Sequence, residues 1–288
     1  MAESFCINTL VGKTSDVGTG KSWSFKDVVE LVKSHPDSQL MQYVTKTDGL
    51  STMVMYSMDS FYNSETGECK FDSEDFISLL ELCNTFPKEY DYNSGESEST
   101  ASLLRSGKVL LTSVNMSSFS DMQMFPALYG EPVNFIGFPT NSGSGSVVGF
   151  NNRFCVAAKS KNKDGAWAFI RSFLLPDNQN KLDWNLPVNK AAFEQKIADA
   201  MKKQDDNDSV VSTWWYDDVE ITIGPLTEED AQVVRDMVYN ATTEATYDEQ
   251  LMNIITEEAE YYFNGEKSAQ EIAGIIQSRA QLYIDENR

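Results

Sequence analysis

Apolar residues recur along this chain with two periods, and each period predicts a different kind of element. Short apolar runs with few charges predict buried strands over residues 5–11, 109–114 and 154–158. Apolar residues at helical spacing predict helices over residues 25–35, 50–61, 74–86, 100–106, 164–175 and 190–203, and almost wholly helical structure from residue 227 onward. Strands that alternate with helices of this length predict an α/β protein with a helical C-terminal third.

Polar residues at the predicted helix starts support these boundaries. Ser24 and Ser73 are predicted N-caps, because each stands directly before a helical apolar pattern. Thr227 is followed three residues later by Asp230, which is similar to a capping box. The polar, glycine-containing stretches 12–20 and 137–149 are predicted loops, and the second is the best candidate for a crossing between domains.

The charge balance restricts the partners of the protein. Its 288 residues include 23 Lys and Arg against 44 Asp and Glu, which gives a formal net charge of −21 and a pI near 4.3. Such a surface repels phosphate backbones, and no basic stripe in the sequence compensates, so nucleic acid is excluded as the main partner. No apolar run approaches the roughly 20 residues that span a bilayer.

Candidate catalytic and metal-binding chemistry is sparse. The single histidine, His35, precedes Pro36 at a predicted helix end, where a solvated loop residue is expected and nothing nearby supports a Ser-His-Asp triad. The four cysteines lack the Cys-x-x-Cys spacing of a zinc site. A bridge between Cys69 and Cys83 stays open as an alternative, while buried free thiols are the expectation. We expect no catalytic residue, no metal and no cofactor.

Tryptophan residues carry the most informative aromatic pattern. Trp167 lies on the apolar side of the helix predicted at 164–175 and is expected in the core. Trp214, Trp215 and Tyr216 are adjacent, so at least one of their rings is expected on a surface or in a cleft. Flat ring faces beside polar side chains suit a sugar site, because rings stack on C–H groups while polar groups hold hydroxyls. Packing between two lobes explains the same cluster equally well.

Several stretches of the chain follow one another in a recognisable order. They are residues 22–31 (SWSFKDVVEL), 101–111 (ASLLRSGKVLL), 137–146 (GFPTNSGSGS) with 158–174 (AKSKNKDGAWAFIRSFL), 186–194 (LPVNKAAFE) and 254–283. In this order they resemble the extracellular solute-binding proteins of ABC importers, family 1, a mostly carbohydrate-binding group. The last stretch is similar to Gram-positive lipoproteins of this group. Ser22 departs from the pattern, since the family usually has glycine before the tryptophan.

The resemblance implies a periplasmic-binding-protein-like fold of type II. In this α/β fold two lobes are joined by a hinge, the ligand lies in the cleft between them, and the closed form is read by a membrane permease. The family also has an N-terminal lobe before the helix that follows Trp23, so the chain is expected to be truncated, with that lobe largely missing. The implied segments are 1–17 (strand remnant of the N-terminal lobe), 18–147 and 195–288 (C-terminal lobe, the latter helical) and 148–194 (returning segment of the N-terminal lobe).

Chain order within the family places the ligand-binding wall. It implies contacts from Tyr56, from Asn115, Ser117 and Phe119 after a buried strand, from Thr140 and Ser142 near the crossing, and from Trp214, Trp215 and Tyr216. The implied function is capture of a carbohydrate, in particular an oligosaccharide, and its presentation to ABC permease subunits. The protein is expected to be a monomer, extracellular, and anchored as a lipoprotein in its full-length form. The alternatives are a secreted glycoside hydrolase-like enzyme, a binding protein for peptides or other solutes, and a structural or adhesive surface protein.

Overall fold

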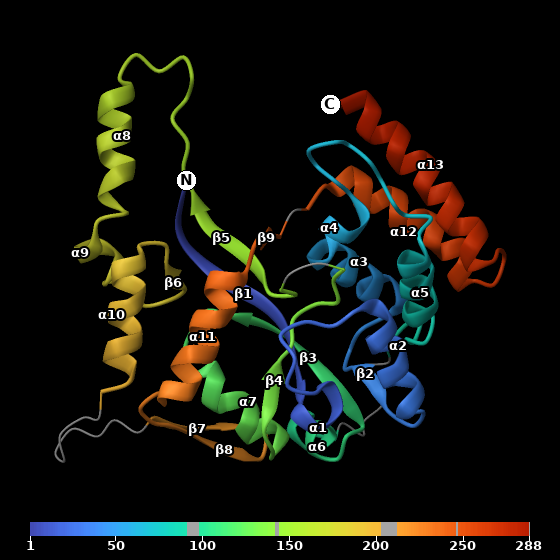
Figure 1. Ribbon diagram of the computed structural model, residues 1–288, viewed down its shortest axis with the longest axis horizontal. Coiled ribbons are helices and arrows are strands. Elements are labelled where there is room, and N and C mark those ends of the chain that lie inside the picture. The colour runs from blue at the N-terminus through green and yellow to red at the C-terminus, as the bar shows by residue number, and fades with distance from the viewer. Residues whose placement is uncertain (91–97, 142–143, 203–211, 246, 288) are drawn as a thin grey trace.

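The central sheet of the molecule is built on one long strand (Figure 1). The computed structural model describes residues 1–288 except 91–97, 142–143, 203–211, 246 and 288. β1 (Ala2–Lys13) pairs antiparallel with β3 (Val109–Met116), β4 (Val133–Phe135), β5 (Val147–Arg153) and β6 (Leu186–Pro187). β2 (Gln39–Met41) extends the sheet beyond β3, and β9 (Thr243–Glu244) extends it beyond β5, both by parallel pairing. Segments far apart in the sequence therefore meet at β1.

Side chains of β1 alternate between two hydrophobic cores, because successive residues of a strand point to opposite faces of its sheet. Ile7 and Val11 belong to one core, and Leu10 belongs to the other. The predicted strand over residues 5–11 is confirmed, and it is longer than its apolar run because pairing with β4 and β5 continues at both ends.

The first core lies between the sheet and the helices on the right of Figure 1. These helices are α2 (Phe25–Ser34), α3 (Lys46–Tyr56), α4 (Met58–Phe61), α5 (Glu74–Cys83), α12 (Glu249–Phe263) and α13 (Ala269–Asn287). The buried rings of Phe61, Phe71 and Phe76 pack against one another with centroids 5.2 to 6.0 Å apart. The two C-terminal helices thus complete a core that begins more than 200 residues earlier in the chain.

The second core lies on the opposite face of the sheet. It is enclosed by α6 (Thr100–Arg105), α7 (Asp121–Tyr129), α10 (Lys190–Ala200), α11 (Glu228–Asn240) and a hairpin of β7 (Ser212–Tyr216) and β8 (Val219–Ile223). Val219 and Ile221 of β8 point into this core, while all of β7 is exposed. α1 (Thr14–Val17) follows β1, and α8 (Lys163–Ser172) and α9 (Pro176–Gln179) lie along the left edge of Figure 1.

The predicted helix starts are confirmed by their capping contacts. Ser24 Oγ accepts a hydrogen bond from the Asp27 N–H, and Ser73 Oγ accepts one from the Phe76 N–H. Thr227 is the N-cap of α11 and forms a complete capping box with Asp230, three residues later. Each such cap contributes about 1 kcal/mol to helix stability.

Three predictions about the strands and loops are wrong. No strand forms over 154–158, because β5 ends at Arg153 and the following residues lack ladder partners in the described part of the chain. β5 begins instead inside the stretch predicted as a loop, because Val147 and Val148 pair with β1. The loop predicted from residue 12 starts later, since β1 continues to Lys13 and α1 follows directly.

Trp167 is not a core residue, since 46% of its surface is exposed. Within α8 only Ile170 is buried, because no element in the described ranges covers the remaining sides of this helix. All four cysteines are free thiols, so the alternative of a Cys69–Cys83 bridge is not realised. Burial raises the pKa of Cys69 to about 11 and that of Cys83 further still, so both thiols stay protonated.

Candidate functional site

Polar side chains gather on the sheet face that carries the first core, where that core ends. Leu10 of β1 and Val147 of β5 belong to the apolar part of this face. Two and four residues before Leu10, the same face carries Asn8 and Cys6, because side chains two apart on a strand share a face. Asn115 of β3 lies directly opposite Asn8 in the register. The face therefore changes from apolar to polar at Asn8.

One oxygen atom organises this polar region. Asn8 Oδ1 accepts hydrogen bonds from Asn115 Nδ2 at 2.9 Å and from the Tyr56 hydroxyl at 3.3 Å. Asn115 Nδ2 also lies 3.0 Å from Cys6 Sγ, and Asn8 Nδ2 donates to the Val147 carbonyl at 3.4 Å. Asn8 is buried, whereas Asn115 is exposed on the surface. We name Cys6, Asn8, Tyr56 and Asn115 the sheet-face cluster.

Tyr56 is the last residue of α3 and is held from two sides. Its ring stacks on that of Phe138, with centroids 4.4 Å apart and an interplanar angle of 29°. Burial raises the pKa of the Tyr56 hydroxyl, and the neighbouring Cys6 thiol adds to the increase. The phenol therefore stays protonated and acts as a hydrogen-bond donor to Asn8.

Backbone features keep space for the cluster. Gly149 of β5 pairs with Cys6, and a Cβ at this position would lie 2.8 Å from Cys6 Sγ and 2.9 Å from Asn8 Nδ2. Only a residue without a side chain allows the two strands and these two side chains to approach so closely. Ser57 donates through Oγ to the Pro139 carbonyl at 2.7 Å, which fixes the loop after Phe138 against the end of α3.

Two further predicted residues follow Asn115 along the chain. Phe119 turns toward the second core and meets the Phe193 ring with centroids 6.2 Å apart. Ser117 is half-buried in the same connection between β3 and α7. Burial raises the pKa of Asp121, at the start of α7, to about 6, although hydrogen bonds from the Ser118 and Ser117 backbone oppose this increase.

The remaining predicted residues lie in other places. Thr140 is half-buried on the loop after Phe138, and its N–H donates to the Trp23 carbonyl at 3.0 Å. Ser142 lies outside the described residues. Trp214, Trp215 and Tyr216 form part of β7, which lies across the molecule from α3 and α4 (Figure 1). The structure therefore brings Tyr56 and Asn115 together and places the three β7 aromatic residues elsewhere.

Sequence reasoning missed three residues of this region, although two of them carried a signal. Cys6 and Asn8 alternate with Phe5 and Ile7 in a short, mostly apolar strand. A polar side chain at alternate positions of a buried strand indicates that part of one face meets a polar environment. Gly149 carried no comparable signal, since its importance depends on which strand it pairs with.

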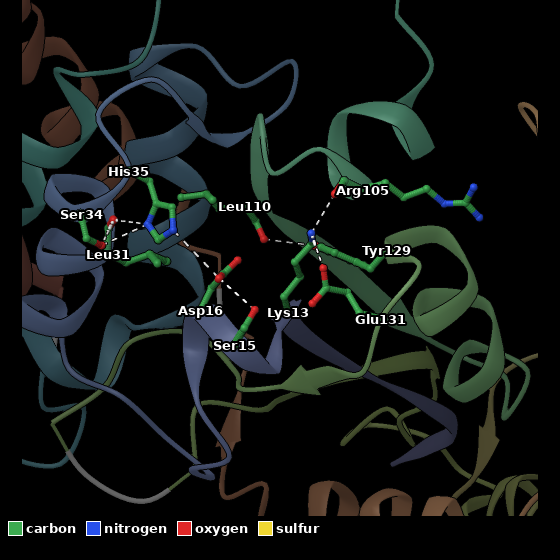
Figure 2. A network of polar contacts seen from close by, with 10 residues as sticks. All are labelled: Lys13, Ser15, Asp16, Leu31, Ser34, His35, Arg105, Leu110, Tyr129 and Glu131. Atoms are coloured by element: carbon green, nitrogen blue, oxygen red, sulfur yellow. Dashed lines mark hydrogen bonds and ion pairs between the residues drawn. The ribbon is translucent and has the colours of Figure 1, made fainter.

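Figure 2 shows that the single histidine is part of a helix terminus. His35 Nδ1 lies 3.0 Å from the Leu31 carbonyl and 3.0 Å from Ser34 Oγ, while Nε2 is 4.0 Å from the Asp16 carboxylate. A carbonyl only accepts hydrogen bonds, so a bond to Leu31 places the proton on Nδ1. Ser34 also donates to the Leu31 carbonyl, at 2.8 Å. The group closes α2 and leaves the Ser34 hydroxyl without a base to activate it.

The other part of the network in Figure 2 fixes the end of β1. Lys13 is buried, and its Nζ donates to Glu131 Oε1 at 2.7 Å and to the Arg105 carbonyl at 2.9 Å. The described part of the chain contains no group of three or more His, Cys, Asp or Glu side chains suited to hold a metal ion. Among the described helices, none has both the length and the hydrophobicity needed to cross a membrane.

Comparison with known proteins identifies a matching family and several solved structures of similar fold. A family model described as bacterial extracellular solute-binding protein matches residues 10–220, and no curated protein matches the chain. Maltose-bound MalE3 of T. maritima is similar in structure, with a TM-score of 0.51 and 11% identity over 98% of this chain and 72% of that one. The GacH receptor of Streptomyces glaucescens, known in complex with acarbose, gives a TM-score of 0.53 and 14% identity over 99% of this chain and 71% of the receptor chain. Lmo0181 from Listeria monocytogenes, in complex with cycloalternan, gives a TM-score of 0.51 and 13% identity over 100% of this chain and 71% of that chain.

These likenesses concern the fold, since every identity is below 15%. The predicted α/β class of periplasmic-binding-protein-like type is confirmed by them. Between a quarter and a third of each neighbouring chain has no counterpart here, because this chain covers 71 to 72% of them.

Proposed function

This chain belongs to the bacterial extracellular solute-binding protein family, and from that premise we propose that it captures a carbohydrate, in particular an oligosaccharide, for an ABC importer. The observation that carries the proposal is the sheet-face cluster, in which a buried Asn8 holds Asn115 and Tyr56 together at the surface. The neighbours bound to maltose and to cycloalternan support a sugar as the ligand.

The chemistry of the cluster favours an uncharged ligand rich in hydroxyl groups. Amide and phenol groups donate and accept hydrogen bonds, as hydroxyls do, and they offer no compensation for a buried charge. No charged side chain of the described chain is hydrogen-bonded to Asn8, Tyr56 or Asn115. A charged peptide or amino acid would lose its hydration there without gaining an ion pair. The cluster therefore suits a neutral sugar better than the peptide alternative.

The protein acts by binding, and the ligand leaves unchanged. The His35 group closes a helix, and the Tyr56 hydroxyl is held as a donor, so neither is suited to remove a proton from a ligand. In this function the partners are the permease subunits of the importer, and the protein works outside the cell as a monomer anchored by a lipid. Ser117, Phe119, Thr140 and Ser142 stay predictions as further ligand contacts, and the three β7 aromatic residues stay a prediction of ligand contact away from this cluster.

We also propose the division into segments 1–17, 18–147, 148–194 and 195–288, with 148–194 belonging to a second lobe. The exposed aromatic residues of this segment support it: Phe169 is 63% exposed and Trp184 is 78% exposed. Phe169 touches only Phe173 among ring contacts in the described residues, and Phe173 stacks on Phe154. Exposed rings of this kind support a surface that a second lobe would cover. A Phe169→Ser variant should lower binding of a hydrophobic dye while the unfolding midpoint stays the same, and unchanged dye binding would contradict the proposal.

The direct test of the function is calorimetric titration of the chain with maltotriose, glucose and a dipeptide. We expect binding of the oligosaccharide alone and a loss of about fivefold or more in affinity for Asn115→Ala, which removes one hydrogen-bonding amide. Asn253→Ala is the matched control, because this amide is exposed on α12 and makes no side-chain hydrogen bond in the described structure. Binding of the dipeptide but of neither sugar would overturn the proposal, as would equal affinities of the two variants.

A further inference from the structure

A second polar region lies on the other side of the sheet, around a cavity of about 520 Å³. The cavity is bounded by the connection between α1 and α2, by β4, by the residues that precede β5 and by the C-terminal half of α11. None of its lining residues belongs to the sheet-face cluster. Its volume lies within the range of small-molecule sites and is many times the about 30 Å³ that one water molecule occupies.

Ser146 is the buried polar residue of this cavity, since the other polar lining residues are half-buried or exposed. It is only 2% exposed, and its backbone N–H bonds to Ser144 Oγ at 3.2 Å. Its own hydroxyl makes no hydrogen bond with any described residue, although it lines the cavity. Because it lines the cavity, the Ser146 hydroxyl is open to a hydrogen bond from a molecule inside it, to which it can act as donor or acceptor.

The position of Ser146 separates this site from the sheet-face cluster. The next residue, Val147, lies on the same face as Asn8, whose amide bonds to the Val147 carbonyl. Because successive side chains of an extended chain point to opposite faces, Ser146 faces the second core. Phe135 and Met237, which also line the cavity, belong to that core.

The charges at the cavity cancel each other. Lys21 Nζ lies 2.5 Å from Asp236 Oδ2, and Gln232 Nε2 donates to the other carboxylate oxygen at 2.8 Å. The hydrogen bond from Lys21, and after it that from Gln232, lowers the pKa of Asp236, so the carboxylate stays ionised and paired. An ionic ligand would find both charges already neutralised.

The rest of the lining combines apolar side chains with hydroxyl and amide groups. Phe135 and Met237 provide buried apolar surface, while Asn240 and Thr242 provide polar groups with no side-chain hydrogen bond to another described residue. A ligand with C–H faces and hydroxyl edges matches this combination, because the apolar wall covers the former and the polar groups bind the latter. A charged ligand would find no unpaired opposite charge among the described lining residues, and a purely apolar ligand would leave the hydroxyl and amide groups without hydrogen bonds.

We propose that this cavity binds a small, uncharged, polyhydroxylated molecule of the size of a monosaccharide or sugar alcohol. The site is separate from the one that carries the proposed function and does not depend on it. Ser146 is its central hydrogen-bonding residue, Asn240 a second one, and Met237 its apolar floor.

The experiment uses methyl NMR of the chain labelled at its eleven methionines, with the Met237 signal assigned by Met237→Leu. Titration with glucose and with xylitol should shift the Met237 signal in a saturable way. The Kd should rise about fivefold or more in Ser146→Ala, as expected for one lost hydrogen bond. Asn240→Ala, at an exposed position, gives a second variant that leaves the core intact.

Asn115→Ala separates this proposal from the proposed function. We expect this variant to lose affinity for maltotriose while its Met237 shift with glucose or xylitol stays that of the parent chain. Absence of a saturable shift with both probes would mean that the cavity holds ordered water only, and the proposal would be wrong. A shift that neither Ser146→Ala nor Asn240→Ala weakens would likewise overturn it.

Discussion

The hydroxyl of Tyr56 and the amide of Asn115 donate to the same atom, Asn8 Oδ1, although the three residues come from α3, β3 and β1. Asn8 is buried and makes three side-chain hydrogen bonds, since its Nδ2 also donates to the Val147 carbonyl. A buried amide with three partners is a strong positional constraint, because each partner must keep its place for these bonds to persist. The cluster is therefore preorganised before any ligand arrives.

Replacing Asn8 by Ala removes the common partner. We expect the free energy of unfolding to fall by about 1–3 kcal/mol, because Tyr56 and the Val147 carbonyl lose their bonds inside the protein. Urea unfolding measures the change, and the exposed Asn253→Ala is the control, with an expected change within about 0.5 kcal/mol. Equal stability of the two variants would show that Asn8 does not hold the cluster together.

The close approach at Gly149 gives a second prediction. In Gly149→Ala the new Cβ would meet Cys6 Sγ at 2.8 Å and Asn8 Nδ2 at 2.9 Å, so the variant should lose about 1–3 kcal/mol of stability and bind ligand more weakly. Gly274 provides the matched control, because it lies within α13 with nothing within 4 Å of an added Cβ. Gly274→Ala should gain about 0.5–1 kcal/mol, since alanine favours the helix. Stabilisation by both substitutions would contradict the packing described here.

Asp121 makes stability depend on pH in an unusual direction. Burial raises its pKa in the folded protein to about 6, from 3.8 in a free carboxyl group, so the folded state binds more protons between these values. Its contribution is therefore fully present below about pH 4 and is lost as the pH rises through about 6. Asp121→Asn should stabilise the chain at pH 7.5 by on the order of 1–3 kcal/mol and have little effect at pH 4.

Asp27 supplies the control with the opposite sign. The hydrogen bond from the Ser24 N–H, and after it that from the Ser24 hydroxyl, lowers the pKa of Asp27, so its contribution is present at neutral pH and is lost as the pH falls below about 4. Asp27→Asn should therefore destabilise the protein at pH 7.5 by up to about 1 kcal/mol, the usual value of a helix cap. Urea unfolding at pH 4, 6 and 7.5 compares the two variants. A stabilising effect of Asp121→Asn that does not change with pH would contradict the assignment.

Local features of the fold could be predicted from the sequence, because they depend on neighbours in the chain. The caps at Ser24, Ser73 and Thr227 are examples, since each contact spans only three residues. The ordered motifs gave the family and the fold class, which the family model and the structural neighbours confirm. Tyr56 and Asn115 were placed by the order of elements in that family.

The predictions that were wrong concern features that depend on contacts between distant segments of the chain. β5 begins at Val147 because β1, about 140 residues earlier, supplies its ladder partners, and the glycine-rich sequence before it gave no sign of this. The alternation along β1 marks Asn8 as a polar residue in a buried strand, but its role depends on partners that lie 48 and 107 residues away. The apolar face of α8 predicted a buried Trp167, but the amphipathic pattern gives only the side of a helix that prefers burial, and not what covers it.

The β7 aromatic residues provide the sharpest test of where the ligand binds. Trp215 is 65% exposed and lies on β7, across the molecule from α3 (Figure 1), the helix that ends at Tyr56. If the sheet-face cluster is the ligand site, Trp215→Ala should leave the Kd for maltotriose within about twofold, with stability unchanged within about 0.5 kcal/mol. Tyr56→Phe should weaken the same binding by about fivefold, because it removes one hydroxyl and keeps the ring on Phe138. The reverse result, a loss of affinity for maltotriose in Trp215→Ala and none in Tyr56→Phe, would place the ligand site at the hairpin, where the sequence analysis expected ligand contacts from the aromatic residues.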